Sequence, residues 1–282
     1  MKFVFVGNRK FVLQEMCALK LDIIDALVIK NTHLEKEISD IVDKYSIISN
    51  KKELLNKLDN LEYDVLVSNG CPYILPISDM KKKLYINIHP SLLPNLKGID
   101  PVIGAILYNK DSGATCHLMN DEIDAGDIIS QVKIPKSEDL DVSLLYQLSF
   151  IAEKQVFRLA FDKNFVANQK QIDGVDDIYY SRCEEDKQID FNESLGLMIN
   201  KVKAFNNKSQ GAYFTYQGDT YKVYDIDIVN NKFVDQYARS FKDQEVLFVY
   251  EDCVVVKKDN NIVKLSRIIG DLSKIKTKSS II

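Results

Sequence analysis

The sequence predicts an α/β protein whose first part is a mostly parallel sheet covered by helices and whose second part is a smaller β-rich domain. Segments with strand and helix periodicity alternate from residue 2 to about residue 161, which is typical of parallel sheets because parallel neighbours need crossover connections. All six prolines lie between residues 72 and 135, where the periodicity gives way to turns around short strands. After about residue 190 the chain changes to short strands separated by turn residues, which is typical of a compact β domain.

The first strand is expected over Lys2–Val6, the turn at Gly7 and Asn8, and the first helix through Leu13 and Leu19. The same alternation continues through the first part of the chain and predicts a Rossmann-like architecture. Further strands are expected at 25–29, 64–68, 84–88 and 114–119, and further helices at 34–45, 51–61 and 140–161.

A domain boundary is expected at the acidic segment 184–188, which separates a first domain at 1–183 from a second at 189–270. The second domain opens with a helix that carries an apolar face and is capped by Asp190 or Asn192. The tail, 271–282, is expected to fray. The strands expected in this domain, at 212–216, 221–228, 246–250, 253–257 and 262–265, predict a small OB-like barrel or open β domain.

The composition limits the classes of function. The 282 residues, 46% hydrophobic and 28% charged, are enough for one full domain and a smaller one. A net charge of -4 gives no basic footprint for a long phosphate backbone, so a nucleic acid partner is not expected. No apolar stretch reaches the roughly 20 residues of a membrane span and no signal peptide core is present, so a cytoplasmic protein is expected. Five scattered cysteines without a Cys-x-x-Cys pair are expected to be reduced thiols.

The turn after the first strand, Gly7-Asn8-Arg9, lacks the second and third glycines of the dinucleotide fingerprint, so NAD is not expected there. Two interpretations of this turn remain open. A strand-to-helix turn can hold a small phosphate on helix N-terminal amides, and Asn8, Arg9 and Lys10 are then substrate-binding residues. Alternatively, the segment is a solvated helix start.

A polar triad is formed by Asn87 and His89, in one motif, and by Asp124. Asn87 and His89 are two residues apart at a strand end, so their side chains point to the same side and can converge on one oxygen atom. Asp124, in a turn before Gly126, is the candidate to hold a proton on His89 or to remove one through a water molecule, and Asp127 is the competing acid. An amide, an imidazole and a carboxylate suit transfer of a one-carbon acyl group to an amine, because hydrogen-bond donors must stabilise the developing oxyanion.

Other interpretations of this region are weaker. A lone histidine is more often a packed or capping residue than a catalyst, but Asn-x-His before Pro-Ser-Leu-Leu-Pro is far more specific than a lone histidine. Cys116 and His117 are not expected to pair as nucleophile and base, because adjacent residues on a strand point to opposite faces. Metal ligation by His89, His117 and Asp124 lacks a ligand-spacing signature, so no metal is expected.

These residues resemble the signature of the folate-dependent formyltransferases, the superfamily of glycinamide ribonucleotide transformylase, methionyl-tRNA formyltransferase and the nucleotide-sugar N-formyltransferases. Asn87, His89 and Asp124 match that family's catalytic Asn, His and Asp. The segments that begin at Ser91 and Lys97 match those that follow the histidine, and the resemblance implies that these two residues contact the substrate. It implies an N-formyltransferase.

The formyl donor implied by the resemblance is 10-formyltetrahydrofolate, without a metal. Segment Asn69–Pro76 resembles the loop whose main chain holds the pterin, and Met119–Asp124 resembles the opposite wall of that pocket. On these two segments the resemblance assigns cofactor contacts to Tyr73, Leu75, Asn120, Asp121 and Ile123.

The likeness returns weakly at 189–192, 202–205 and 211–214, similar to the start of the C-terminal domain in the tRNA and sugar members. Three observations favour a sugar over tRNA: the acidic net charge, a chain short for a tRNA enzyme, and Asn95–Asp100 in place of an Arg-rich segment. The expected acceptor is therefore a dTDP-linked amino-dideoxy sugar, with dTDP-4-amino-4,6-dideoxyglucose favoured over its 3-amino isomer, for a bacterial surface glycan such as the O-antigen of lipopolysaccharide. The alternative is methionyl-tRNA formyltransferase. A homodimer is also expected, because members of the sugar kind are commonly dimers.

Overall fold

The computed structural model describes residues 1–172, 174 and 177–281 of the chain. These residues form two compact units. The first comprises Met1–Pro101, Asp111–Pro135 and Gln147–Tyr180, and the second comprises Val102–Lys110, Lys136–Tyr146 and the residues from Ser181 onward. Two short segments of the N-terminal half thus group with the second unit, a division that local composition does not reveal.

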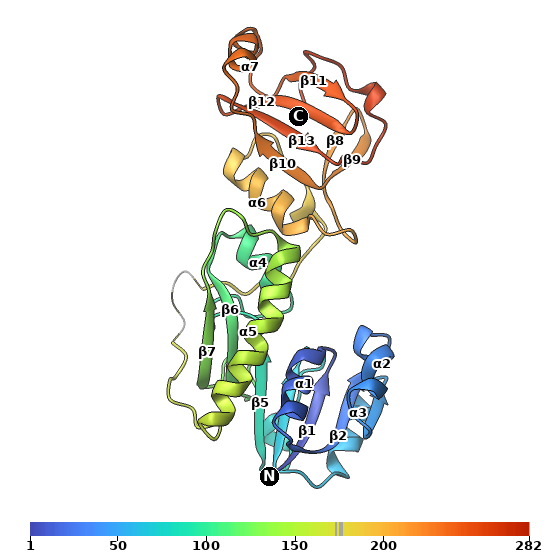
Figure 1. Ribbon diagram of the computed structural model, residues 1–282, viewed down its shortest axis with the longest axis vertical. Helices are drawn as coiled ribbons and strands as arrows, with labels where there is room; N and C mark the ends of the chain where they lie inside the picture. Colours follow the sequence, from blue (N-terminus) through green and yellow to red (C-terminus); the bar gives the residue numbers. More distant parts are fainter. Residues whose placement is uncertain (173, 175–176, 282) are drawn as a thin grey trace. The chain divides into compact units, whose positions relative to one another are not determined.

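The first unit is built on one sheet whose strands run in the order β3-β2-β1-β4-β5-β6-β7 (Figure 1). The strands from β3 to β5 pair in parallel, whereas β6 and β7 are antiparallel to their neighbours. The expected mostly parallel sheet is confirmed. The strands are β1 (Lys2–Gly7), β2 (Asp22–Ile29), β3 (Tyr45–Ile48), β4 (Val65–Asn69), β5 (Leu84–His89), β6 (Ser112–Leu118) and β7 (Ile128–Ile134). The helices along this part of the chain are α1 (Lys10–Ala18), α2 (His33–Glu37), η1 (Ile38–Asp40), α3 (Lys51–Asp59), η2 (Ile77–Asp79), α4 (Pro101–Leu107) and α5 (Val142–Asp162).

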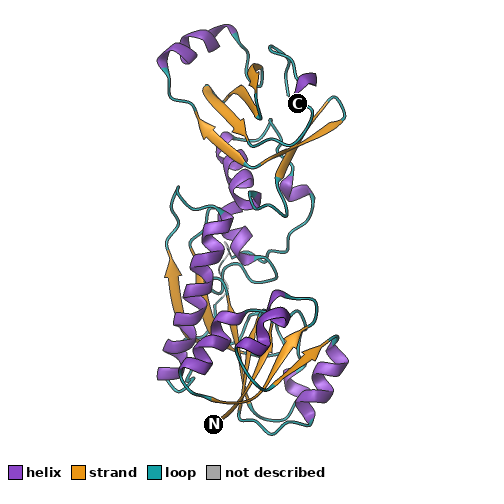
Figure 2. Ribbon diagram, turned by 45° about the vertical axis from the view of Figure 1, so that its right-hand side comes forward, coloured by secondary structure: helices purple, strands orange, loops and turns teal. Residues whose placement is uncertain are grey.

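Helices cover both faces of this sheet (Figure 2). On one face, α1 and α5 pack on a core that includes Phe5 and Phe157. On the other face, α3 packs through Leu54 and Leu58 on a second core that includes Val6. Because side chains alternate along each strand, every central strand contributes to both cores, and these layers hold the strand ends rigidly in place.

The segment expected as one helix at 34–45 differs in the structure. Helix α2 ends at Glu37, and Tyr45–Ile48 forms β3, which pairs in parallel with Ala26–Ile29 of β2. Local apolar spacing is compatible with a helix, but pairing with β2 gives this main chain a hydrogen-bond ladder, so tertiary context overrides local preference. Strand β7 and helix α4 were also not predicted.

The second unit is β-rich, as expected. It contains a sheet with the order β10-β13-β12-β11 and a separate β8-β9 hairpin. The strand expected at 221–228 is two strands, and α7 lies where only a loop was expected. The elements are η3 (Glu185–Lys187), α6 (Leu195–Phe205), β8 (Ala212–Tyr216), β9 (Asp219–Val223), β10 (Asp225–Ile228), α7 (Lys232–Tyr237), η4 (Ala238–Ser240), β11 (Val246–Tyr250), β12 (Cys253–Lys258), β13 (Asn261–Ser266) and η5 (Leu272–Lys274).

Two local expectations for this unit are wrong. Helix α6 is capped by Ser194, whose hydroxyl accepts a hydrogen bond from the Leu197 amide at 3.4 Å, in place of Asp190 or Asn192. The tail does not fray, because the Val246 amide donates to the Ser279 carbonyl at 2.9 Å and the side chain of Ile281 is fully buried. Main-chain pairing with β11 and one buried apolar side chain therefore order the tail.

Two further findings bear on the class of protein. In the part of the chain that the structure describes, no helix has both the length and the apolar character that crossing a bilayer requires. Within the same ranges, no group of three or more His, Cys, Asp and Glu side chains is arranged to hold a metal ion.

Candidate active site

A pocket of about 380 Å³ lies at the carboxyl ends of β1, β4 and β5, the edge at which α/β sheets commonly bind ligands. Its walls come from the turn after β1, the loop after β4, the end of β5 and the loop between β6 and β7. The expected site residues that line it are Asn8, Arg9, Tyr73, Leu75, Asn87, His89, Asn120, Ile123 and Asp124.

Asn87 and His89 come from the end of β5, whose alternation directs both side chains to the pocket side. Strand β6 pairs antiparallel with β5, and its register sets His117 directly opposite Asn87. A register shift follows Cys116 on the β7 side of β6, and such bulges re-aim side chains next to functional sites. Cys116 faces the apolar core instead, so it is not paired with His117, as the sequence predicts.

Asp124 reaches this cluster from a tight loop. Its φ of 51° lies in the left-handed region, and the next turn requires Gly126, where an added Cβ would lie 1.8 Å from the Leu118 carbonyl oxygen. The Gln171 side-chain amide donates to the main-chain carbonyls of Asp124 and Gly126 at 2.9 and 2.7 Å. The Asp124 carboxylate in turn accepts from the Gly98 amide at 3.1 Å, so the loop and its carboxylate are both fixed.

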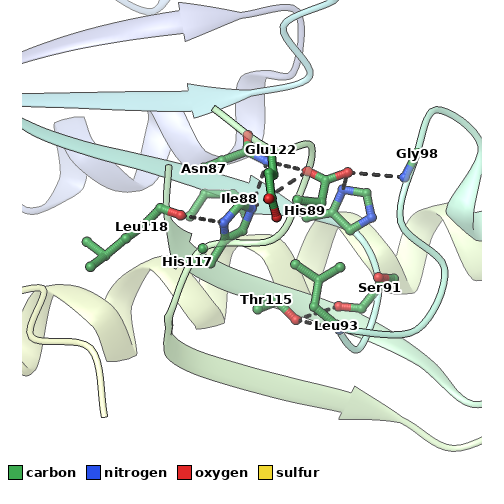
Figure 3. Close-up of polar contacts among 12 residues, drawn as sticks. Asn87, Ile88, His89, Ser91, Leu93, Gly98, Thr115, His117, Leu118 and Glu122 are labelled. Carbon is green, nitrogen blue, oxygen red and sulfur yellow. Dashed lines mark hydrogen bonds and ion pairs between the residues drawn. The ribbon is translucent and has the colours of Figure 1, made fainter. Parts of the chain in front are cut away.

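The three triad side chains meet, and Figure 3 shows Asn87, His89 and His117 close together at the end of the strand. The Asn87 amide nitrogen donates to Asp124 Oδ1 at 3.3 Å, and His89 Nδ1 lies 3.4 Å from Asp124 Oδ2. The second amide hydrogen of Asn87 faces His117 Nε2 at 3.2 Å. One carboxylate thus holds both partners from the Asn-x-His motif.

Electrostatics assign different charge states to the acid and the base. Burial lowers the pKa of His89, against the raising effect of the Asp124 carboxylate and the Leu96 carbonyl. Burial alone would raise the pKa of Asp124, but His89, His117 and the Gly98 amide lower it to about 2. At neutral pH the pair is therefore an ionised carboxylate beside a neutral imidazole, and the imidazolium expected from the sequence is not the resting state.

The tautomer of His89 follows from its other nitrogen. Nε2 lies 2.9 Å from the Leu96 carbonyl oxygen, which can only accept, so the single hydrogen of the neutral ring is on Nε2. Nδ1 then carries the lone pair and lies 3.4 Å from Asp124 Oδ2. A group in this state can take a proton from a bound amine and leave a cation beside a carboxylate.

Lys10 and Asp121 do not line the pocket. Lys10 forms an ion pair with Glu37 at 2.5 Å, and Asp121 accepts from the Ser78 amide at 3.0 Å. Any contact of these two residues with substrate or cofactor stays a prediction.

Ser91 and Lys97 also lie outside the lining. Ser91 is fully buried, and its hydroxyl donates to the Asn95 carbonyl at 2.8 Å. The main chain of Lys97 exchanges hydrogen bonds with Ile178 and Tyr180. In the structure both residues shape the loop after β5, and their contact with substrate stays a prediction.

Arg9 lines the pocket, but its side chain is already paired with another residue of the protein. Its guanidinium forms an ion pair with Glu153 of α5, a carboxylate that is fully buried and also accepts from the Asn69 amide at 3.2 Å. Burial raises the pKa of Glu153, opposed by Arg9 and Asn69. Arg9 therefore compensates a buried charge, a constraint that the sequence interpretation of a free phosphate-binding arginine did not include.

Comparison with known proteins identifies the family. The model of the formyl transferase family matches residues 26–160, and the model of the formyl transferase C-terminal domain matches residues 183–276. The chain belongs to the formyl transferase family. This confirms the family and the class of enzyme expected from the Asn-x-His motif.

Individual relatives of this formyl transferase are distant. A methionyl-tRNA formyltransferase of Sulfurimonas denitrificans is 29% identical over 160 residues, which are 55% of this chain and 51% of that protein. One from Ehrlichia canis is 31% identical over 171 residues, 59% of this chain and 55% of that protein. The chain thus spans about half the length of these curated relatives. A solved structure described as WlaRD, a sugar 3N-formyl transferase in the presence of dTDP and 5-N-formyl-THF, matches with a TM-score of 0.74 at 21% identity over 94% of this chain and 97% of that chain. At this identity the likeness shows the fold.

The sugar-nucleotide acceptor expected from the sequence is contradicted by the curated relatives. Those compared are methionyl-tRNA formyltransferases at 25 to 31% identity, which favours the alternative acceptor. The expectation rested on net charge, chain length and one loop; net charge and chain length are sums over the whole chain and do not describe the surface that meets a substrate. The argument against a nucleic acid partner had the same basis and loses its support.

Proposed function

We propose that this chain transfers a formyl group from 10-formyltetrahydrofolate to the α-amino group of methionine carried on tRNA. The observation that carries the proposal is the cluster of Asn87, His89 and Asp124, whose polar atoms lie 3.3 and 3.4 Å apart at the pocket. The acceptor is proposed from the matching relatives, which are methionyl-tRNA formyltransferases.

The walls of the pocket suit the formyl donor. Tyr73 and Leu75 on one loop and Met119 and Ile123 on the other give apolar surface, which pockets for small flat ligands commonly present. The solved relative in the presence of 5-N-formyl-THF supports this choice of donor. When bound, 10-formyltetrahydrofolate supplies a formyl carbon activated by its attachment to nitrogen.

The rim of the pocket suits a methionyl acceptor. Ile99 and Tyr179 line it with 74% and 57% of their surfaces exposed. Large apolar side chains exposed at a pocket mouth mark a ligand contact, and the methionine thioether is flexible and apolar enough to cover both. A polar sugar would leave them in water.

The chemistry follows from the charge states. When the donor binds, the Asn87 amide exchanges its 3.3 Å hydrogen bond to Asp124 Oδ1 for one to the formyl oxygen, where negative charge develops. As the amine nitrogen bonds to the formyl carbon, His89 Nδ1 accepts the proton that the amine loses, and Asp124, 3.4 Å away, stabilises the imidazolium. The bond between the formyl carbon and the nitrogen of the donor then breaks, and the imidazolium returns the proton to that leaving nitrogen.

The test is mass spectrometry of purified chain incubated with 10-formyltetrahydrofolate and charged initiator methionyl-tRNA. Formylmethionine on the tRNA is expected, with loss of about 10²-fold or more in rate for His89→Ala. His33→Ala, which removes an exposed histidine on α2, is the matched control and should retain full rate. Formyl transfer to a dTDP-amino sugar with none to tRNA would refute the proposal.

Binding of tRNA gives a second test. Phosphate contacts release counterions, so the logarithm of the association constant for tRNA should fall linearly with the logarithm of the salt concentration. Affinity for tRNA that does not change with salt would contradict a phosphate-based contact. Homodimer formation and a cytoplasmic location stay predictions, to be checked by light scattering and by cell fractionation.

A further inference from the structure

Glu153 is a fully buried carboxylate on α5 that the proposed chemistry does not use. Its neighbours on the same face of the helix, Ala152, Val156 and Phe157, belong to the apolar core. An apolar side chain in this place would often stabilise the fold as well or better, because burying an ion pair costs about as much as the attraction returns. A paired carboxylate in a core can be purely structural, but Glu153 has a second contact that leads to the pocket.

The second contact of Glu153 is Asn69, the last residue of β4, which is also fully buried. One carboxylate oxygen pairs with the Arg9 guanidinium, and the other lies 3.2 Å from the side-chain nitrogen of Asn69. The same nitrogen lies 3.2 Å from the main-chain carbonyl oxygen of Ile88. Since a carbonyl oxygen can only accept, the nitrogen end of the amide faces Ile88, and its other hydrogen is donated to Glu153. Both carboxylate oxygens therefore accept, which is the ionised form.

The Asn69 amide keeps this orientation although its other end is not satisfied. Among the residues that the structure describes, none donates a hydrogen bond to the buried side-chain oxygen of Asn69. An unpaired buried oxygen is costly, so the two hydrogen bonds of the nitrogen must outweigh that loss. The contacts with Glu153 and Ile88 thus decide how the Asn69 side chain lies.

Asn69 is also the residue at which the chain leaves the sheet. The parallel register of β4 with β5 ends at Ser68, which pairs with Asn87. The next residue extends the contact through its side chain, and the chain turns away at Gly70 with a φ of 72°. The main-chain carbonyl of Asn69 accepts from the Asn8 amide, in the turn after β1, at 3.2 Å. One residue therefore joins the carboxyl ends of β1, β4 and β5, at which the pocket lies.

The segment that follows Asn69 is a wall of the pocket. This donor loop, residues 70–75, lines the pocket along its whole length and, as the structure describes it throughout, has no helix or strand of its own. Its position therefore depends on its anchors. We propose that Glu153 is a positioning residue of the donor site, which fixes the start of the donor loop against the end of β5 through the Asn69 amide. This role rests on the proposed function for the identity of the donor.

Two double variants of equal charge and similar volume separate positioning from removal of the ion pair. Arg9→Met with Glu153→Gln keeps an oxygen that can accept from Asn69, whereas Arg9→Met with Glu153→Met removes that acceptor as well. Calorimetric titration with 5-formyltetrahydrofolate, which is present in the solved relative, gives the dissociation constants. The value for the Glu153→Met variant is expected to be about tenfold higher, because one buried hydrogen bond is lost. Equal dissociation constants would overturn the proposal.

A double-mutant cycle tests action through Asn69. Asn69→Ala in the wild-type background, with both charges intact, should also weaken binding about tenfold. In the background of Arg9→Met with Glu153→Met it should cause no further loss, and a full additional loss would refute the route through Asn69. The control is Glu15→Met with Arg158→Met, which removes another ion pair of α5 with a buried carboxylate. It should leave the dissociation constant unchanged, and an equal loss there would overturn a specific role of Glu153.

Hydrogen exchange of the ligand-free protein adds a local measurement. In peptides that cover residues 70–75, amide exchange should be faster for the Glu153→Met double variant than for the Glu153→Gln one, with urea unfolding reporting their global stability. Equal exchange would overturn the anchoring of the loop.

These measurements distinguish failure of the proposed function from failure of the positioning role. If the dissociation constants follow the expected pattern but tRNA is not formylated, the acceptor fails and the role of Glu153 stands. If tRNA is formylated and all variants bind 5-formyltetrahydrofolate equally, only the role of Glu153 fails. If the wild-type chain does not bind 5-formyltetrahydrofolate, the proposed donor fails, and exchange at residues 70–75 decides whether Glu153 positions the loop.

Discussion

Substituting Asp124 by Asn is the most informative change in the triad, because it removes the charge and keeps the shape. In the structure the carboxylate lies 3.4 Å from His89 Nδ1 and accepts from the Gly98 amide at 3.1 Å. With an effective dielectric constant of about 20, unit charges at that separation attract by about 5 kcal/mol. This attraction exists only when His89 is protonated, so it belongs to the step in which the base takes a proton.

Two kinetic results are expected from Asp124→Asn. The value of kcat/KM should fall by about 10²-fold or more, because the imidazolium loses its counter-charge. Burial lowers the pKa of His89 below its ordinary 6.5 and Asp124 opposes that effect, so the acid limb of the pH–rate profile should move to lower pH in the variant. Rates measured from pH 4.5 to 8.5 with saturating donor give both values.

A stability result is expected from the same variant. The pKa of Asp124 falls from 3.8 to about 2 on folding, which corresponds to about 2 kcal/mol of unfolding free energy. A depressed carboxyl pKa contributes above the unfolded value and is lost as the pH falls through the folded value. Asp124→Asn should therefore be less stable than wild type, and the difference should shrink from about pH 4 toward pH 2. In the kinetic measurement, an acid limb of the pH–rate profile that is unchanged in Asp124→Asn would refute the assignment of His89 as the base.

Three further changes test other parts of the site. Asn87→Ala should lower kcat by about 10²-fold to 10³-fold with little effect on KM, as expected for a donor used only when the oxyanion develops; a change confined to KM would exclude this role. Arg9→Ala leaves the buried Glu153 carboxylate without its cation and should cost about 3 to 5 kcal/mol in urea unfolding, and adding Glu153→Gln should restore most of it. Gly126→Ala places a Cβ 1.8 Å from the Leu118 carbonyl oxygen and should destabilise the fold by about 1 to 3 kcal/mol, with activity falling further than stability alone explains.

The sequence predicted the triad because its information is local. Asn87 and His89 lie in one short segment, and strand geometry alone puts them on the same side. The residues that follow Asp124 predict a turn, and the structure confirms that this loop brings its carboxylate within 3.4 Å of Asn87 and His89. The parallel strands were likewise predictable from alternation, whereas the edge strand β3 was not, because its state depends on pairing with β2.

The supporting residues were not predictable for a different reason. His117 acquires its relation to Asn87 only through the register of β5 with β6, and a single sequence does not encode an antiparallel register across 30 residues. Glu153 lies on a helix with an ordinary amphipathic pattern, and nothing local distinguishes it from a solvated acid. Its burial against Arg9 and Asn69 is a tertiary fact.

The wrong expectation for the acceptor has a physical origin that applies beyond this chain. Net charge sums every side chain, whereas a nucleic acid meets only those within about 10 Å of its phosphates at ordinary ionic strength. In this chain the acidic excess is only 41 against 37 basic residues, a difference too small to fix the sign of any one surface.

The side chains exposed at the pocket mouth are more direct evidence for the acceptor than the net charge is. Ile99 and Tyr179 are exposed there by 74% and 57%, and replacing Ile99 by Asp should raise KM for methionyl-tRNA several-fold while leaving formate release from the donor unchanged. A loss of both activities in Ile99→Asp would show that the rim serves the donor instead.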